Sequence, residues 1–294
     1  MSRSPGSPLR FALIGAGRVG TAVCENLLRA GHVISGVSSR EAESAKRSAV
    51  RLNTNVFDHR SRLPATDAIL LGVPDEAIAS VVSAIAPFLV SGTRVVHFAG
   101  ALGIGPLREA RDAGCGAAAL HPVQSFPDPD RGGLRLVGSA WGVTTTSDLE
   151  AWAVELIERD LGGFAVIVAE DARPIWHAAA VSTSNGVAAL LTLGEAMLAA
   201  IGIEEPHRVL GPLATGTVAN AAERGGAGSL TGPVVRGDRE SLALHLRALS
   251  DVSSHLAEDY SHIARVIVNS AVRAHRIEKE EAERMLELMK NPDQ

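Results

Sequence analysis

Short apolar runs alternate with amphipathic stretches over the first half of the chain. Seven of these runs have the length and residue types of buried strands: Arg10–Gly15, His32–Val37, Ala68–Val73, Thr93–Phe98, Gly116–His121, Ala140–Thr144 and Ala165–Val168. The stretch Val19–Ala30, between the first two runs, has apolar residues at helical spacing. Strands that alternate with helices in this way are typical of parallel βαβ units, with one sheet between two layers of helices.

After about Glu170 the strand pattern ends and only helical spacing remains. The predicted helices are Ala172–Ile201, Glu205–Arg224, Arg239–Arg276 and Glu278–Lys290, with a break expected inside the third. A glycine-rich segment, Gly225–Gly237, separates the second of these helices from the third. We therefore predict an α/β Rossmann-type dinucleotide-binding domain at residues 10–168, followed by an all-α substrate and dimerisation domain at residues 169–294.

Composition narrows the class of protein. Hydrophobic residues make up 46% and charged residues 21% of the 294 residues, which excludes a disordered chain. The net charge of −5 argues against a nucleic-acid partner, because such domains normally carry a basic surface. The two cysteines, Cys24 and Cys115, are isolated from each other in sequence. This excludes a disulfide scaffold and a cysteine-rich zinc site, so we expect no metal and a reducing compartment.

No part of the sequence predicts an association with a membrane. The first nine residues are polar and interrupted by proline, unlike a signal peptide. Long apolar stretches such as Ala178–Leu193 are interrupted by Ser, Thr, Asn and Gly, short of the roughly 20 residues that a membrane-spanning helix needs. We therefore expect a cytoplasmic protein.

A glycine-rich turn follows the first predicted strand. Its sequence is Gly15-Ala16-Gly17-Arg18-Val19-Gly20, with the spacing G-x-G-x-x-G, and it leads directly into an amphipathic helix. In this context Gly15 makes the tight turn, Gly17 lets the backbone approach a pyrophosphate, and Gly20 allows close packing of helix on strand. We expect these six residues to bind a dinucleotide at the helix N-terminus. A tight turn without a ligand is the alternative.

The end of the second predicted strand indicates which nicotinamide cofactor binds. NAD enzymes place an Asp or Glu there to accept from the ribose 2′-hydroxyl, whereas this chain has Ser38, Ser39 and Arg40. An arginine suits the 2′-phosphate of NADP, because guanidinium and phosphate form paired hydrogen bonds. Glu41 competes with this interpretation, but it can equally form a capping box with Ser38 at the start of the next helix. We therefore predict NADP(H), with Ser38, Ser39 and Arg40 in contact with it.

Further candidates follow the third and fourth predicted strands. Val73 and Pro74 end the third strand, and Asp75 after them can cap the next helix. Ligands of open α/β sheets bind outside the carboxyl ends of the strands, where these residues are predicted to lie. His97 is either a structural residue or part of the site, and the small Gly100 would let a flat nicotinamide ring lie close. We expect Val73, Pro74 and Gly100 to contact the cofactor.

Two histidines are candidate proton donors. His121 ends the fifth strand, and His177 lies on the first helix of the second half, on one stripe with Ser184 and beside Asn185. This polar stripe either faces the nicotinamide or is satisfied between packed helices. In the first case the catalytic residues are His177, His121, Ser184 and Asn185. We expect His177 rather than His121 to be the acid, because the turn at Pro122 can hold His121.

The loop Leu230–Asp238, framed by glycines, holds a candidate for substrate binding. Arg236 can bind a substrate carboxylate, with Asn185 as a second substrate contact, and Asp238 can cap the following helix. A surface connector in which Arg236 pairs with Asp238 is the alternative.

Together these residues resemble the Rossmann-like/DUF2520-type family over almost the whole chain. The resemblance rests on the glycine turn, Val73-Pro74, His97 with Gly100-Ala101, His121-Pro122 with Phe126, His177 with Ser184-Asn185, and Thr231-Gly232-Pro233 with Arg236-Gly237-Asp238. The broader group looks like pyrroline-5-carboxylate reductase and the β-hydroxyacid dehydrogenases, whose helical domains dimerise. The resemblance implies an NADPH-dependent reductase of a small carbonyl acid, most specifically 2-dehydropantoate (ketopantoate), in pantothenate biosynthesis.

One departure from these relatives bears on the chemistry. The better-known ketopantoate reductases and β-hydroxyacid dehydrogenases have a catalytic lysine four residues before a helix asparagine. Counting back from Asn185 gives Val181 instead. The lysines of this chain are Lys46, Lys279 and Lys290. A ketone reductase with this sequence needs another proton donor, and His177 and His121 are the candidates because imidazole titrates near neutral pH.

Two other functions are compatible with the sequence. An imine reductase of the pyrroline-5-carboxylate type needs less help from an acid, because an iminium is already electrophilic. A non-catalytic NADP-binding regulatory protein needs no proton donor at all. For every one of these functions we predict a homodimer through the helical domain, because Ala178–Leu193 and Ile263–Val272 are more apolar than one small domain can hide.

Overall fold

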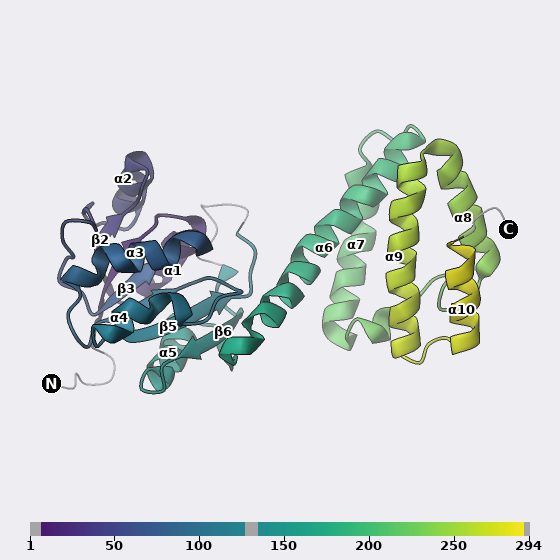
Figure 1. The fold of residues 1–294 in the computed structure, drawn as a ribbon. Coiled ribbons are helices and arrows are strands. Elements are labelled where there is room, and N and C mark those ends of the chain that lie inside the picture. The colour runs from purple at the N-terminus through teal and green to yellow at the C-terminus, as the bar shows by residue number, and fades with distance from the viewer. Residues whose placement is uncertain (1–6, 127–134, 291–294) are drawn as a thin grey trace. The chain divides into compact units, whose positions relative to one another are not determined.

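The computed structural model describes residues 7–126 and 135–290. Contacts within the chain divide it into two compact units, Met1–Ser184 and Asn185–Gln294 (Figure 1). The division falls inside the long helix α6 (Arg173–Ala200), and not at the boundary of 168 and 169 expected from the sequence pattern. The reason is that the first turns of α6 make hydrogen bonds and ring contacts with the sheet.

The first unit is built on one seven-stranded sheet with the order β2-β1-β3-β4-β5-β6-β7. The strands are β1 (Arg10–Ile14), β2 (Val33–Ser38), β3 (Ala68–Leu71), β4 (Arg94–His97), β5 (Gly116–Pro122), β6 (Ala140–Thr145) and β7 (Phe164–Ile167). Neighbouring strands are parallel except for the antiparallel pair of β5 and β6. This confirms the predicted fold class and the seven predicted strands.

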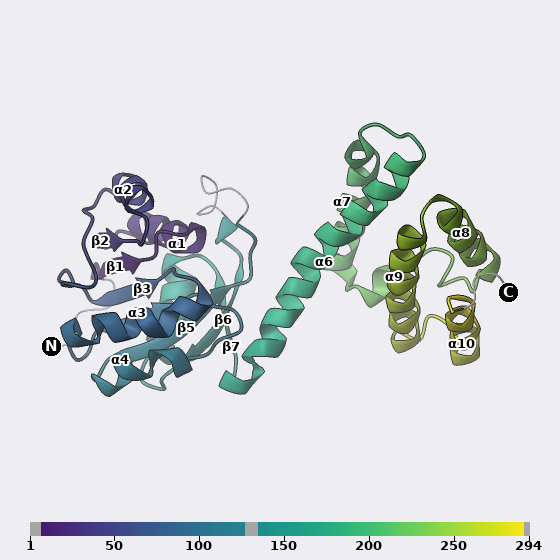
Figure 2. The same cartoon turned by 45° about the horizontal axis from the view of Figure 1, so that its top comes forward.

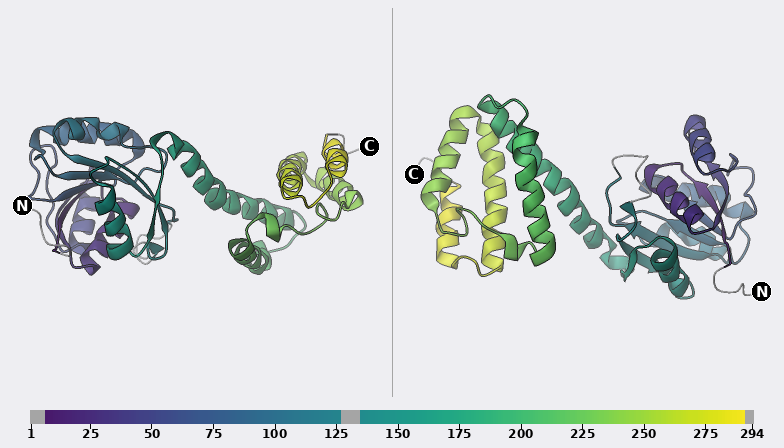
Figure 3. Two further views of the ribbon diagram at one scale, coloured as in Figure 1. Left: turned by 90° about the horizontal axis from the view of Figure 1, so that it is seen from below. Right: turned by 180° about the vertical axis from the view of Figure 1, so that it is seen from behind.

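Helices cover both faces of this sheet, as the views in Figures 2 and 3 show. They are α1 (Arg18–Arg29), α2 (Ala42–Arg51), α3 (Ile78–Ile85), α4 (Arg108–Asp112) and α5 (Glu150–Glu155). Phe11 and Leu13 of β1 pack on one face with Leu27 of α1, whereas Ile14 packs on the other face with Ile78 of α3. Strands buried on both faces carry continuous apolar runs, which is why the sequence pattern located them.

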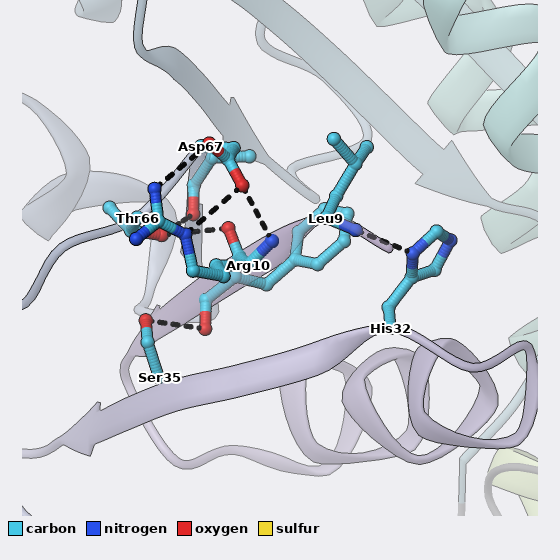
Figure 4. A network of polar contacts seen from close by, with 8 residues as sticks. Leu9, Arg10, His32, Ser35, Thr66 and Asp67 are labelled. Carbon is cyan, nitrogen blue, oxygen red and sulfur yellow. Dashed lines mark hydrogen bonds and ion pairs between the residues drawn. The ribbon is translucent and has the colours of Figure 1, made fainter. Parts of the chain in front are cut away.

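Polar contacts hold the amino end of β1 in register (Figure 4). The Asp67 carboxylate accepts from the backbone N–H of Arg10 at 2.8 Å and from its guanidinium at 3.3 Å. The Thr66 hydroxyl donates to the Arg10 carbonyl at 2.9 Å, and the Leu9 N–H donates to Nδ1 of His32 at 3.1 Å. These side chains are committed to the fold, so the opposite, carboxyl edge of the sheet is the place to look for a site.

The second unit consists of helices, as predicted. After the C-terminal part of α6 come α7 (Pro206–Arg224), α8 (Arg239–Val252), α9 (Ser254–Arg273) and α10 (Lys279–Leu288). The expected break inside 239–276 falls at Ser253, whose extended backbone ends α8 and whose hydroxyl caps α9. Asp238 caps α8, as predicted, by accepting from the Ser241 N–H at 3.0 Å. Among residues 7–126 and 135–290, no helix combines the length and apolar character needed to cross a membrane.

The helices of the second unit differ sharply in burial. α8, α9 and α10 enclose an apolar core that includes Leu242, Val268 and Met285. In contrast, α7 has no buried residue, and the only buried residue of α6 is Arg173 in the first unit. The apolar side chains of α6 and α7 are therefore largely exposed within the chain.

Candidate active site

The turn after β1 has a backbone that only glycines allow. Gly15 has a φ of +92°, and a Cβ there would lie 2.6 Å from the carbonyl carbon of Gly72, in the turn after β3. A Cβ on Gly20 would lie 2.8 Å from Leu13, so this glycine permits the close packing of α1 on β1. α1 begins after Gly17 without a side-chain cap or an acidic residue in its first turn. The first N–H groups of α1 are thus suited to an anion.

The predicted capping box at the start of α2 is wrong. Ser38 is the last residue of β2, and its hydroxyl lies 2.8 Å from Nδ1 of His59. α2 begins at Ala42, after Glu41, without a side-chain cap. The Glu41 carboxylate accepts instead from the Ser44 hydroxyl at 3.2 Å. Strand pairing outweighs the capping preference here, because β2 pairs with β1 as far as Ser38.

The end of β2 also meets a basic segment that the sequence pattern did not reveal. His59 and Arg60 follow a stretch that pairs with β2 through a bridge between Val37 and Val56. Burial lowers the pKa of His59, and the neighbouring Arg60 lowers it further. Arg40 itself is exposed. At this end of the sheet Arg40 follows β2 where NAD enzymes have a ribose-binding carboxylate, and the carboxylate of Asp58, beside His59, accepts from the backbone N–H of Arg60 at 3.0 Å.

Asp75 does not cap the helix after β3, contrary to the prediction. It opens a 3₁₀ turn, Asp75–Ala77, and α3 then begins at Ile78 without a side-chain cap. Burial raises the pKa of Asp75, while the charges of His177 and Arg173 lower it. Asp75 thus lies within electrostatic reach of the start of α6, and Gly72, Val73 and Pro74 link it to the end of β3.

His97 has a structural role. Its side chain is fully buried at the end of β4. Nδ1 accepts from the Ala99 N–H at 3.1 Å, and Nε2 lies 2.8 Å from the Gly103 carbonyl, to which it donates in the same tautomer. Burial lowers the pKa of His97 to about 4. Both ring nitrogens are therefore used to shape the loop that carries Gly100.

Arg173, which the sequence analysis missed, holds this loop to the start of α6. The side chain is completely buried, and its guanidinium donates to the carbonyls of Leu102 at 3.1 Å, Gly142 at 3.0 Å and Ala99. Burial lowers the pKa of Arg173 to about 10, against the opposing effect of Glu170 and Asp75. Its hydrogen-bond partners are backbone carbonyls, so no acidic residue in the sequence pointed to it.

Glu170 completes the attachment of the same loop. Its carboxylate accepts from the N–H groups of Ile104 at 2.9 Å and Gly105 at 3.0 Å. A Cβ on Gly103 would lie 2.2 Å from this carboxylate, so the glycine makes room for it. The loop after β4 is therefore held from both sides by residues that immediately precede or begin α6.

Both histidine candidates lie on this frame, beside Gly100. A Cβ on Gly100 would be 2.3 Å from Cδ2 of His177, so the imidazole rests against bare backbone. The rings of His177 and His121 meet edge to face, with centroids 5.5 Å apart and planes at 88°. The indole N–H of Trp176 donates to Nδ1 of His121 at 3.1 Å. β5 continues through Pro122, so there is no turn at Pro122 to hold His121, and the contact with Trp176 holds it instead.

His121 lies in an environment that favours the neutral ring. Burial is the main cause that lowers its pKa to about 4, and the positive charge of Arg173 and the nearby His177 contribute in the same direction. A histidine with such a pKa is uncharged over the physiological pH range and can act as a hydrogen-bond donor without being an imidazolium.

Family models cover most of the chain. Residues 4–122 match the Rossmann-like domain, and residues 139–267 match DUF2520, a domain of unknown function. The chain is a Rossmann-like/DUF2520 protein. This confirms the resemblance inferred from the glycine turn, the two histidines and the loop at Arg236.

Solved structures share the fold of this Rossmann-like/DUF2520 chain. A protein from Bacteroides fragilis, described provisionally as an NADP oxidoreductase, has a TM-score of 0.72 at 23% identity, over 88% of this chain and 98% of its own. A reductive aminase from Aspergillus terreus, solved with NADPH and ethyl-5-oxohexanoate, has a TM-score of 0.60 at 15% identity, over 97% and 93%. A pyrroline-5-carboxylate reductase from Coxiella burnetii has a TM-score of 0.58 at 13% identity, over 98% and 100%. A comparison with curated proteins finds no match.

The other expected site residues of the Rossmann-like/DUF2520 chain do not join the cluster around Gly100 within one unit. Ser184 is exposed at the end of the first unit, whereas Asn185 and Arg236 are exposed residues of the second unit. The carboxylate of Asp238 is bonded to the N–H and hydroxyl of Ser241, and within the described residues it forms no ion pair with Arg236.

Each lysine of the chain forms an ion pair with a glutamate of its own helix or helix end. Lys46 pairs with Glu43 at 2.9 Å, Lys279 with Glu283 at 4.0 Å and Lys290 with Glu287 at 2.8 Å. At Val181, where the β-hydroxyacid dehydrogenase resemblance implies a lysine, the side chain is apolar and 39% exposed.

Proposed function

We propose that this protein is an NADP(H)-dependent reductase of a small carbonyl acid, with 2-dehydropantoate (ketopantoate) as the best candidate and pantoate as the product. The observation that carries the proposal is the His177 imidazole against the bare backbone of Gly100, with the His121 ring packed edge to face on it, on the sheet edge that also has the glycine turn. Fold similarity to a reductive aminase solved with NADPH, and to pyrroline-5-carboxylate reductase, supports a nicotinamide-dependent reductase. The choice of ketopantoate rests on the family resemblance alone. We expect the enzyme to work in the cytoplasm.

The chain has a cradle of suitable shape for the cofactor. At Gly15 and Gly17 a Cβ would lie 2.6 Å and 3.1 Å from the backbone of Gly72, so side chains there would fill the approach to the first turn of α1. The pyrophosphate would be held by Gly15, Ala16, Gly17, Arg18, Val19 and Gly20. The 2′-phosphate would be held by Ser38, Ser39 and Arg40, and the nicotinamide by Val73, Pro74 and Gly100. When bound, NADPH would supply the hydride for the substrate carbon.

The residues of the chain would bind and polarise the substrate. His121 and His177 are the groups beside Gly100 that can donate to a carbonyl oxygen as it gains negative charge. We assign Ser184 and Asn185 to the same oxygen, and Arg236 together with Asn185 to the rest of the substrate, its carboxylate in particular. These last assignments rest on the family resemblance.

Imine reduction of the pyrroline-5-carboxylate type is the second candidate. One observation favours it: Val181 stands where the dehydrogenases would have their lysine, and the lysines of the chain are paired with Glu43, Glu283 and Glu287. A non-catalytic NADP-binding regulator would leave two imidazoles at Gly100 without a use, so we place it third.

We also propose a homodimer through α6 and α7. Val181 and Leu190 of α6 are 39% and 48% exposed, and Val209 and Leu213 of α7 are 58% and 68% exposed. Apolar surface on this scale normally marks an interface. The other stretch expected in the interface, 263–272, is mainly used inside the chain, because Val268 and its neighbours in α9 are buried against α8 and α10.

Oxidation of NADPH tests the proposal directly. We expect ketopantoate to support NADPH oxidation well above the rate without substrate, and above the rate with pyrroline-5-carboxylate. Faster turnover of pyrroline-5-carboxylate would favour the second candidate. Tight NADPH binding without turnover of any small carbonyl acid or cyclic imine would favour the regulator.

The cofactor assignment has its own test. Because Arg40 stands in place of the ribose-binding acid, NADPH should bind more tightly than NADH, and Arg40→Ala should remove most of this preference. Loss of a charge-assisted hydrogen bond to a phosphate costs about 1.5–3 kcal/mol, or roughly 10- to 150-fold in affinity. Titration of both cofactors by calorimetry measures it, with Arg29→Ala, a substitution at the far end of α1, as the control. Equal affinity of the unmodified protein for NADPH and NADH would refute the assignment.

A further inference from the structure

Trp176 and His121 form a side-chain contact between α6 and β5. The indole N–H donates to Nδ1 of His121 at 3.1 Å, between residues 55 positions apart in sequence. The indole reaches this position by crossing Gly142, the residue that pairs with His121 in the neighbouring strand β6. A Cβ on Gly142 would lie 2.6 Å from Nε1 of Trp176. The contact therefore needs a glycine on β6 and is built into the sheet.

This contact defines the proton positions on His121. An indole N–H can only donate, so Nδ1 of His121 must accept and cannot itself carry a proton. A neutral imidazole then carries its proton on Nε2, and a charged imidazolium would set two N–H groups against each other. The neighbouring groups act in the same direction, because Arg173 and His177 on α6 both lower the pKa of His121 and so disfavour a positive ring.

The Nε2–H group is left available. No described residue forms a hydrogen bond with Nε2 of His121, and this nitrogen is not among the fully buried polar atoms that lack a partner. His97, in contrast, uses both ring nitrogens on backbone groups of its own loop. Of these two neutral histidines, only His121 can offer a donor to a ligand at the Gly100 surface.

We infer that Trp176 is a positioning residue that holds His121 as a neutral Nε2–H donor, and that the site therefore takes a substrate with a carbonyl oxygen rather than an iminium nitrogen. A carbonyl oxygen has lone pairs for the Nε2–H and gains charge as the carbon is reduced. An iminium N–H⁺ is itself a donor and would face the Nε2–H donor to donor. This inference rests on the proposed reductase function and decides between its two substrate classes.

The chemistry balances without charging the histidine. When bound, the reduced cofactor would give up a hydride to form the new C–H bond and would be left in its oxidised form, and the π electrons of the C=O bond would become a lone pair of the alkoxide. His121 stabilises this alkoxide through the Nε2–H hydrogen bond and keeps its proton. A water molecule then protonates the alkoxide and leaves as hydroxide. His121 is thus a polarising donor and not a general acid, a role that the sequence analysis assigned first to His177.

Imidazole nitrogen shifts of the full-length protein without cofactor test the first half of the inference. At neutral pH we expect His121 to show a protonated Nε2 and an unprotonated Nδ1. In Trp176→Phe, which keeps an aromatic ring but loses the N–H donor, we expect a mixture of tautomers and a roughly three- to tenfold tighter protonation of His121, the equilibrium equivalent of one ordinary hydrogen bond. Trp152→Phe is the control. Trp152 lies on α5 with its ring against Arg94 of β4, so its replacement should change neither the tautomer nor the protonation of His121. A protonated Nδ1 in the unmodified protein, or unchanged shifts in Trp176→Phe, would overturn the assignment.

Steady-state kinetics test the second half. We expect His121→Leu to lower kcat on the carbonyl substrate by about 10²- to 10³-fold, the usual effect of losing one donor to an oxyanion. His121→Gln can still donate through its side-chain amide and should recover part of this loss, and NADPH affinity should be unchanged in both. Preference of the unmodified enzyme for a cyclic iminium over its carbonyl analogue would overturn the substrate class. Failure of NADPH to bind would instead refute the proposed function, while the nitrogen shifts would still report on the tautomer.

Discussion

The two units of this chain differ in how completely they bury their apolar side chains and pair their polar ones. In the first unit every layer has its own core, and buried polar groups such as Arg173 and His97 are bonded to backbone. In the second unit α8 to α10 share a core, while α6 and α7 leave apolar side chains exposed. The first unit is complete as a folded body. The second leaves apolar side chains of α6 and α7 exposed, which the proposed dimer would cover.

The difference extends to the candidate site residues. His177 contacts both Gly100 and the ring of His121 within the first unit. Ser184, Asn185 and Arg236 are exposed, and within the described part of the chain their side chains form no hydrogen bond or ion pair. The first group is held ready by the fold, as preorganised electrostatic stabilisation requires. The second group belongs to surfaces whose surroundings the proposed dimer would supply.

The largest expected effect concerns the glycine turn of the first unit. Gly15→Ala places a Cβ 2.6 Å from the backbone of Gly72, at a φ of +92°. We expect NADPH affinity to fall more than about 100-fold, because the turn must move to relieve a contact with rigid backbone. Cofactor titration by fluorescence measures the loss.

Gly31→Ala is the matched control for this turn. Gly31 has nearly the same φ, +89°, but a Cβ there would meet nothing within 4 Å. Both variants carry the same backbone strain, of about 1–2 kcal/mol, but only Gly15→Ala creates a clash. If Gly31→Ala weakened NADPH binding as much as Gly15→Ala, strain in the unit rather than the shape of the turn would explain the effect.

The next effect tests how the start of α6 is attached. Arg173→Met keeps the length of the side chain but leaves three backbone carbonyls without their donor, and two of them, of Gly142 and Ala99, form buried hydrogen bonds with Arg173. We expect the first unit to lose roughly 3–5 kcal/mol of stability, because each unmet buried acceptor carries a desolvation penalty. Urea unfolding followed by tryptophan fluorescence measures it well, since the three tryptophans, Trp141, Trp152 and Trp176, all precede residue 184.

Arg94→Met serves as the comparison for Arg173→Met. Arg94 is half-buried and stacks over Trp152, with its guanidinium carbon 4.8 Å from the ring centroid, instead of bonding to carbonyls. Its loss should cost only about 0.5–1 kcal/mol. Equal costs for the two variants would show that the carbonyl contacts of Arg173 do not hold the loop after β4.

Sequence reasoning succeeded where short-range patterns decide the structure. Strands buried on both faces, the glycine turn and the cap at Asp238 all follow from residues that are neighbours in sequence. It failed at Ser38 and Asp75, where strand pairing and a 3₁₀ turn displaced the expected helix caps. Both failures have the same cause, because a capping motif records a local preference that the sheet can override.

The partners of the candidate site were beyond the reach of such patterns. Arg173 donates to the carbonyl of Ala99, 74 residues earlier. Every residue has a backbone carbonyl, so the sequence does not show which one a buried arginine will contact. Trp176 bonds to His121 from 55 residues away. The position of each histidine at a strand or helix end could be predicted, but its tautomer and its role required the tertiary contacts.

The stability of the two units should respond differently to acid. His97 and His121 have pKa values lowered to about 4 by burial in the first unit. Unfolded histidines take up protons below about pH 6.5, whereas these two stay neutral in the folded state until about pH 4. The unfolded state therefore binds more protons in this window, so the stability of the first unit falls as the pH decreases, by up to about 1.4 kcal/mol per pH unit for each histidine.

Two probes distinguish the units in this experiment. Tryptophan fluorescence follows the first unit, and the fluorescence of Tyr260, the single tyrosine of the chain, follows the core of the second. We expect the midpoint of urea unfolding measured by tryptophan to shift with pH between about 6.5 and 4. His97→Asn should reduce the slope, if it folds, and Trp176→Phe should reduce it through His121. A tryptophan midpoint that does not change with pH would mean that the two histidines are protonated in the folded state.

The smallest expected effect bears on the exposed helices of the second unit. Leu213 of α7 is 68% exposed, so Leu213→Glu should leave the stability of the isolated chain nearly unchanged. In a dimer that buries this side chain, the charge would have to be desolvated, at a cost of about 1.5–3 kcal/mol or roughly 10- to 150-fold in the dissociation constant. Light scattering over a dilution series measures the change.

Leu244→Glu provides the contrast that makes this result specific. Leu244 is 60% exposed on α8, which already has its core, so the same charge there should leave the association unaffected. Weakening by Leu213→Glu alone would place the interface on α7, whereas equal weakening by both would spread it over the whole unit. An unmodified protein that is monomeric at micromolar concentration would contradict the proposed dimer. The exposed apolar side chains of α6 and α7 would then have to be covered by a partner other than a second copy of the chain, because surface of this kind is rarely left bare.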